Sequence, residues 1–133
     1  MIITKTLLDS LTEQAKKSPR LRMSLDLRNT SDDLSQRMLN AIEPGSELPI
    51  HRHLCSSETC VCIRGHFEEY FYDEIGNLTD TVDMVPGGNV LNIEAGQWHS
   101  LKCLDTGTVI LECKNGKYQP LAENEIYQDK NRE

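Results

Sequence analysis

From residue 66 onward the chain alternates between short apolar runs and turns that contain glycine or proline. The strand-like runs cover residues 66–72, 78–84, 90–93, 97–104 and 108–114. Short strands at regular spacing, separated by such turns, are typical of sandwiches and barrels. This half of the chain therefore predicts an all-β domain.

The first third of the chain is less uniform. Residues 4–17 carry leucines at helical spacing and predict an amphipathic helix. This helix should end at Ser18-Pro19, because the residue before a proline avoids the helical region. Residues 21–27 alternate apolar and polar side chains and predict a half-buried strand. Residues 36–42 fit both a helical and an extended pattern, and propensity alone favours the helix there.

A polar stretch between two glycines, GSELPIHRHLCSSETCVCIRG, holds three side chains that can bind a metal: His51, His53 and Glu58. The run that carries both histidines should be a strand. Residues two apart on a strand point to the same face, so both histidines can reach one ion. Glu58 opens the next apolar run after a short turn, and its carboxylate can return to the same point. A lone His-x-His pair is as often part of a surface loop, but the added glutamate favours a metal site.

The spacing of this stretch, from Gly45 to Gly65, resembles the first motif of the cupin superfamily at every fixed position. The second cupin motif has the form Gly-x5-Pro-x-Gly-x2-His-x3-Asn. Residues 88–103 fit it, with Glu94 in place of the proline and Cys103 in place of the asparagine. The resemblance implies a cupin jelly-roll barrel, also called a double-stranded β-helix. It further implies one divalent metal ion held by His51, His53, Glu58 and His99.

The same resemblance implies that residues 36–42 form a strand directly before the first motif. Other stretches are similar to a smaller cupin group, the WbuC-type metalloproteins of bacterial polysaccharide gene clusters. These stretches are Ser18-Pro19-Arg20, QRMLNA at 36–41 and ECKNGKY at 112–118. We therefore expect three regions in the chain. They are an N-terminal helix and leading strand over 1–30, the barrel over 31–118, and a polar, loosely attached C-terminal tail over 119–133.

Charge and composition exclude several classes of function. Lysine and arginine number 14 against 21 acidic residues, which gives a net charge of −7. Nucleic-acid binding requires a basic surface, so no nucleic-acid partner is expected. The start, MIITKTLLDSL, has no long apolar segment, and no run approaches membrane-spanning length. We therefore expect a cytoplasmic protein without a membrane partner, and its five cysteines should be reduced.

Alternation along the strands also predicts what surrounds the metal. If Glu58 points inward, so do Cys60 and Cys62, and Cys103 shares the parity of His99. These thiols either line the site or fill space as small hydrophobes. Four cationic side chains could bind an anionic or sugar ligand, or could equally well pair with surface acids. They are Arg20, Arg22, Arg37 and Lys114.

Three imidazoles and one carboxylate suit divalent Fe, Mn, Ni or Zn. On a six-coordinate ion they would leave two positions open for substrate, water or dioxygen. The leading hypothesis is a metal-dependent isomerase or dioxygenase acting on a sugar, a nucleotide-sugar or a small carboxylate in polysaccharide metabolism. The alternative is a non-catalytic sugar-binding or sensor module, because no general base is evident outside the ligand set. A thiol redox sensor is a third hypothesis, and since cupins are often dimers, the resemblance also implies a homodimer.

Overall fold

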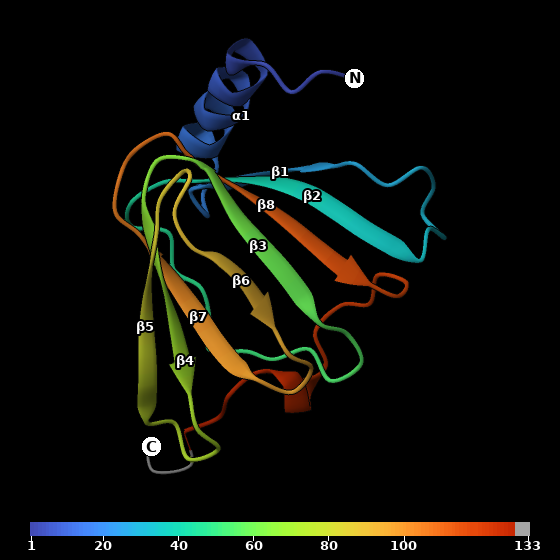
Figure 1. Ribbon diagram of the computed structural model, residues 1–133, viewed down its shortest axis with the longest axis vertical. Coiled ribbons are helices and arrows are strands. Elements are labelled where there is room, and N and C mark those ends of the chain that lie inside the picture. The colour runs from blue at the N-terminus through green and yellow to red at the C-terminus, as the bar shows by residue number, and fades with distance from the viewer. Residues whose placement is uncertain (130–133) are drawn as a thin grey trace.

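Antiparallel pairing arranges the strands into two sheets in the computed structural model, which describes residues 1–129 (Figure 1). The larger sheet has the order β1-β2-β8-β3-β6 and the smaller one β5-β4-β7. The larger sheet consists of β1 (Arg22–Asp26), β2 (Ser35–Ile42), β8 (Thr108–Asn115), β3 (Glu58–Arg64) and β6 (Val90–Ile93). The smaller sheet consists of β5 (Leu78–Met84), β4 (Phe67–Tyr72) and β7 (Trp98–Cys103). The two helices are α1 (Lys5–Lys17) and a one-turn 3-10 helix, η1 (Glu123–Glu125).

This architecture confirms the predicted all-β jelly roll with a short N-terminal helix. The ambiguous run at 36–42 is a strand, β2, which pairs along its whole length with β8 and over residues 38–42 with β1. Its position between two neighbouring strands explains why a sequence with helical propensity becomes extended, since pairing and packing override weak local preferences.

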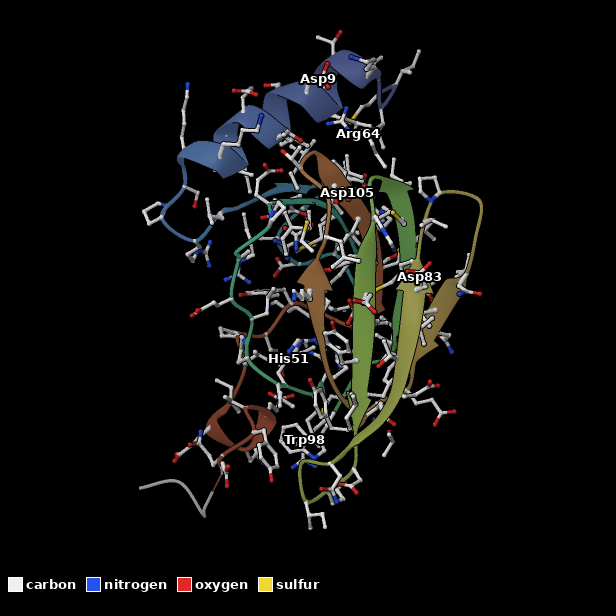
Figure 2. The ribbon with its side chains drawn as sticks, turned by 90° about the vertical axis from the view of Figure 1, so that its left-hand side faces the viewer. Asp9, His51, Arg64, Asp83, Trp98 and Asp105 are labelled. Carbon is white, nitrogen blue, oxygen red and sulfur yellow. The ribbon has the colours of Figure 1, made fainter. Side chains whose placement is uncertain are left out.

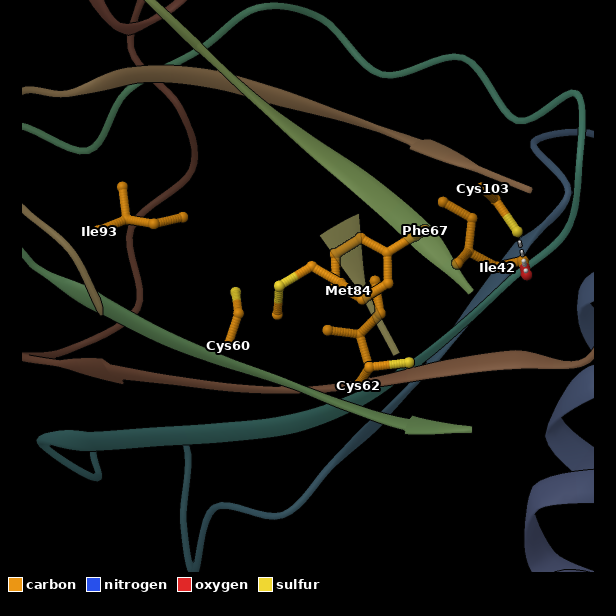
Figure 3. Packing of buried hydrophobic residues seen from close by; sticks show 8 residues of the cluster. Ile42, Cys60, Cys62, Phe67, Met84, Ile93 and Cys103 are labelled. Carbon is orange, nitrogen blue, oxygen red and sulfur yellow. Dashed lines mark hydrogen bonds between the residues drawn. The ribbon is translucent and has the colours of Figure 1, made fainter. Parts of the chain in front are cut away.

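The space between the two sheets is filled by one apolar cluster (Figure 3). Phe67 and Met84 are fully buried at its centre. Cys60, Cys62 and Cys103 all point into it, as the strand alternation predicts. The Cys103 thiol donates a hydrogen bond to the carbonyl oxygen of Ile42 at 3.3 Å. The cysteines are free thiols.

The opposite face of the larger sheet carries α1. Leu8, Leu11 and Ala15 of the helix pack on Leu39, Ala41 and Val109 of β2 and β8. Arg64 ties the helix to the barrel, because its guanidinium contacts Asp9 at 2.6 Å and Thr12 at 3.0 Å. Within residues 1–129 no helix is both long and apolar enough to cross a membrane.

Both glycines that bound the first motif adopt backbone angles that other residues avoid. Gly45 has φ of 92° and Gly65 has φ of 88°. A Cβ at Gly65 would also lie 2.6 Å from the Cα of Thr108. The turn from β3 to β4 therefore requires glycine at position 65.

Two local expectations are wrong. His51 and His53 lie in an irregular stretch between β2 and β3, where only His51 forms an isolated bridge. Pro49 has no N–H group to offer a strand ladder, which limits regular pairing there. The C-terminal tail is also not loosely attached over residues 119–129, because Ile126 pairs with His51 and Tyr127 donates to the carbonyl of Ile50 at 2.9 Å. Residues 130–133 of the predicted tail lie outside the described residues.

Candidate metal centre

Three histidines from distant parts of the sequence meet at the end of the barrel opposite α1. The ring centroids of His51 and His99 are 4.3 Å apart, and those of His51 and His53 are 5.2 Å apart. Each of the three residues offers a ring nitrogen within 4.8 Å of the others, a spacing that could hold one metal ion. Figure 2 shows His51 and Trp98 in the half of the molecule away from Asp9 and Arg64.

Backbone contacts orient two of these rings. His51 and His99 exchange backbone hydrogen bonds, at 3.0 Å from the His51 N–H and 2.8 Å from the His99 N–H. Their Nδ1 atoms lie 3.0 Å from the Pro49 carbonyl and 2.9 Å from the Gln97 carbonyl. Because a carbonyl only accepts, Nδ1 carries the proton and Nε2 keeps the lone pair for a metal.

Burial favours the metal-binding form of His51. Burial, followed by the charge of the neighbouring His99, lowers the pKa of His51 to about 4. The ring is therefore neutral at physiological pH, as a histidine must be to coordinate a metal.

Glu58 supplies a carboxylate from the first residue of β3. Its Oε2 atom lies 3.5 Å from Nε2 of His99 and 3.8 Å from Nε2 of His53. Burial alone would raise the pKa of Glu58, but the contact with His99 and the charge of Lys114 outweigh it and hold the pKa at about 2. The group is therefore a carboxylate at neutral pH.

Two atoms of this group are buried without a hydrogen-bond partner: Nε2 of His53 and Oε2 of Glu58. Buried polar atoms are rarely left unsatisfied in native proteins. A metal ion between the three imidazoles and Glu58 would satisfy both atoms at once, so the donor set fits a divalent transition metal.

A cavity of about 230 Å³ opens beside these residues. Arg22, Cys60 and Lys114, which the sequence suggested as ligand-binding residues, line it. Lys114 lies 3.8 Å from Glu112. The Cys60 thiol donates to Glu58 at 3.2 Å, so this cysteine contacts a candidate metal ligand directly.

The other suggested residues are not among those that line the cavity in the described part of the chain. Arg20 is exposed. Arg37 points to the outer side of β2 and bonds to Asp33 at 3.2 Å. Cys62 and Cys103 belong to the apolar cluster. Strand parity explains these positions, since Arg37 alternates with inward residues and the two thiols lie deeper along their strands.

Two acidic residues in the cavity wall were missed from the sequence. Glu69 of β4 is only 1% exposed, and burial, aided by the charge of Glu58, raises its pKa well above the usual range. Glu112 of β8 has its pKa raised to about 7, first by burial and then by Glu58. Strand alternation could have indicated that both point inward. Glu69 shares a strand face with Phe67, and Glu112 shares a strand face with Lys114, because alternate residues of a strand point to the same side.

The C-terminal segment, defined here as residues 119–127, completes the rim. Gln119 and Leu121 line the cavity. The backbone N–H of Arg52 donates to the Glu125 carbonyl at 2.9 Å, and the Leu54 N–H donates to the Glu125 carboxylate at 2.9 Å. Hydrogen bonds from residues on both sides of His53 thus fix the irregular histidine stretch.

Trp98 strengthens the same attachment from outside the barrel. Its ring meets Tyr127 edge-on with centroids 5.5 Å apart, and the Arg52 guanidinium lies 4.3 Å from it. The partner of Trp98 outside the barrel is thus the C-terminal segment.

Comparison with known proteins gives a family match and a set of structural neighbours. The model of a domain family of unknown function, DUF6016, matches residues 3–84. A search of curated proteins found no match.

Solved structures with a similar fold include KdgF from Halomonas sp., at 15% identity and a TM-score of 0.61 over 76% of this chain and 84% of that one. CapF, a capsular polysaccharide assembling protein from Staphylococcus aureus, has 19% identity and a TM-score of 0.68 over 83% of this chain. The match spans only 32% of CapF. Oxalate decarboxylase from Lactobacillus farciminis has 22% identity and a TM-score of 0.58, over 73% of this chain and 29% of that one. At these identities the likeness shows the fold alone, and that fold is the cupin jelly roll.

Proposed function

The chain belongs to the DUF6016 domain family, and since that family has no known function, we propose one from the site itself: a metal-dependent cupin enzyme that acts on a small ligand. His51, His53, His99 and Glu58 would hold one divalent transition metal. The metal would supply Lewis-acid or redox chemistry and would orient ligand oxygens.

The observation that carries this proposal is the pair of unpartnered buried atoms, His53 Nε2 and Glu58 Oε2, at the centre of a histidine cluster. Folding that leaves such atoms unsatisfied costs free energy, about 1–3 kcal/mol for each group. Coordination to a metal removes this cost for both atoms.

The cavity supports an enzyme over a purely structural metal site. A structural site closes around its metal, whereas this one lies beside an open cavity. The sequence offered no general base outside the ligands, but Glu69 and Glu112 line the same cavity as the histidines. Either carboxyl group could exchange a proton with a bound ligand.

We further propose a role in polysaccharide metabolism. The similarity of residues 36–41 and 112–118 to the WbuC-type cupins supports this role, and so does the structural likeness to CapF. The homodimer, the cytoplasmic location and the three-region division of the chain stay predictions.

Elemental analysis tests the metal site. Protein purified without chelator should contain close to one equivalent of Fe, Mn, Ni or Zn. The His51→Ala/His99→Ala double variant should contain almost none. His66→Ala is the matched control, because His66 pairs with Asp83 on the surface and should keep the metal.

Two results would contradict the proposal. One is no metal in the wild-type protein after reconstitution with each of the four ions. The other is equal metal in the wild type and the double variant, which would place the ion elsewhere. A full complement of metal with no exchangeable water or ligand on it would favour the non-catalytic module.

A further inference from the structure

Two polar atoms outside the metal ligands are also buried without a hydrogen-bond partner: Nε of Arg22 and Oε2 of Glu69. Both residues line the cavity. They lie on different sheets, Arg22 on β1 and Glu69 on β4. Because folded proteins rarely bury unsatisfied polar atoms, a ligand in the cavity is the natural partner for both.

Arg22 requires an acceptor. A guanidinium only donates, and its Nε–H group is directional. Among residues 1–129, no carboxylate lies within ion-pair distance of Arg22, whereas Lys114 has Glu112 at 3.8 Å. Burial lowers the pKa of Arg22, the charge of Arg20 lowers it further, and the charge of Glu112 offsets only part of this. An anionic group on the ligand would supply the missing charge.

Glu69 faces the same space with different chemistry. It is 1% exposed, and burial followed by the charge of Glu58 raises its pKa well above the usual range. This direction favours the protonated carboxyl group, which can both donate and accept a hydrogen bond. A hydroxyl group has the same two abilities and is its natural counterpart.

Charge and size narrow the ligand further. The opposite charges of Lys114 and Glu112 cancel. A divalent ion carries more positive charge than the Glu58 carboxylate neutralises, and Arg22 adds a further positive charge. The cavity of the metal-loaded protein is therefore positively charged. The cavity, at about 230 Å³, is smaller than the roughly 300–1,000 Å³ of pockets for drug-sized ligands. It can enclose a compact anion but not a whole nucleotide-sugar.

We infer that the ligand of this cavity is a compact hydroxy acid whose carboxylate accepts from Arg22 and whose hydroxyl group meets Glu69. This inference rests on the proposed metal site, because the ion contributes to the positive charge. Arg22 and Glu69 would then set specificity from opposite walls.

Isothermal titration of the metal-loaded full chain with three probes tests this. D-Glycerate carries both groups, glycerol lacks the carboxylate, and propionate lacks the hydroxyls. Glycerate should bind at least tenfold more tightly than either of the others. Arg22→Gln should weaken glycerate binding at least tenfold, and Glu69→Leu, which removes both the donor and the acceptor, should remove most of the advantage of glycerate over propionate.

Two variants are matched controls. Arg37→Gln changes an arginine on the outer side of the same sheet, whose guanidinium donates to the Leu27 carbonyl. Glu68→Leu changes the residue before Glu69, and Glu68 accepts a hydrogen bond from the Tyr70 hydroxyl. Both should bind glycerate within twofold of the wild type.

The metal content of each sample separates two kinds of failure. Wild-type protein with full metal that binds glycerate and glycerol equally would overturn the hydroxy-acid inference and leave the metal proposal standing. Unchanged glycerate binding in Arg22→Gln would also overturn the hydroxy-acid inference and leave the metal proposal standing. Wild-type protein that takes up no metal would overturn both. The comparison of probes on the wild type needs no variant, so it holds even if a substitution impairs folding.

Discussion

A cysteine can act as a redox sensor only if its thiol reaches solvent and ionises. Cys60, Cys62 and Cys103 are all less than 5% exposed. Burial raises the pKa of Cys60 well above the usual range and that of Cys62 to about 11, and it also raises the pKa of Cys103. Because the thiolate is the reactive form, these three positions are unsuited to redox sensing. Cys55 is exposed instead.

We predict that the native protein reacts rapidly with Ellman's reagent at Cys55 alone. Cys113 is half-buried and should react more slowly. The remaining three thiols should react only after denaturation, because they are buried and protonated. Absorbance at neutral pH, with and without guanidinium, measures this, and Cys55→Ser is the control that should lose the rapid phase. Rapid modification of Cys60 in the native protein would revive the redox hypothesis.

Residue-level prediction from the sequence succeeded where strand parity applied. Glu58, Cys60 and Cys62 alternate along β3 and all point inward. The same rule could have identified Glu69 and Glu112, but acidic residues are expected on the surface. Their burial comes from the closure of two sheets around them, which no local pattern records.

At the scale of elements, the four candidate metal ligands are held in place to different degrees. His99 and Glu58 lie on regular strands, which hold them by ladder hydrogen bonds. His51 and His53 lie on an irregular stretch that the C-terminal segment fixes through Arg52, Leu54 and Glu125. Groups that orient metal ligands from outside commonly affect metal affinity by 10- to 100-fold.

We therefore predict that Glu125→Ala lowers metal affinity about tenfold without unfolding the protein. The change removes the carboxylate that accepts from the backbone N–H of Leu54, next to His53, and from that of Ala122. Competition with a chromogenic chelator measures the affinity, and circular dichroism monitors the fold. Glu123→Ala is the matched control, because Glu123 is exposed in the same 3-10 helix. Equal affinity in the two variants would show that the segment does not support the site.

The sequence predicted the strands of this fold better than its ends. The runs at 78–84 and 90–93 coincide with β5 and β6, because alternation and glycine turns are local signals. The C-terminal segment was expected to be loosely attached because it is polar. Its attachment comes from backbone hydrogen bonds, from the Glu125 carboxylate and from the contact between Trp98 and Tyr127, all between residues far apart in the sequence. Such partners cannot be predicted from composition.

For the whole molecule, the fold separates stability from chemistry. The apolar contacts of α1 lie on the outer face of the larger sheet. The candidate metal centre lies at the other end of the barrel, as Figure 2 shows for Asp9 and His51. Sites that are far apart and share no partners usually contribute independently to stability. The helix should therefore stabilise the barrel without tuning the metal.

This separation can be tested by Leu11→Ala, at a residue that is 4% exposed between α1 and the sheet. Removing a buried leucine side chain loses its transfer free energy and leaves a cavity, so we expect a loss of roughly 2–5 kcal/mol in the free energy of unfolding. Leu34→Ala is the matched control. Leu34 is 70% exposed, and its truncation should change stability by no more than about 0.5 kcal/mol.

Urea unfolding of both variants should be measured with a chelator present, because bound metal adds to apparent stability by mass action. The metal content of separately loaded Leu11→Ala should equal that of the wild type while the protein is folded. If this variant loses metal while it is still folded, the packing beneath α1 affects metal binding by the histidines at the other end of the barrel. The helix would then be part of the site's support, and the two ends of the molecule would form one energetic unit.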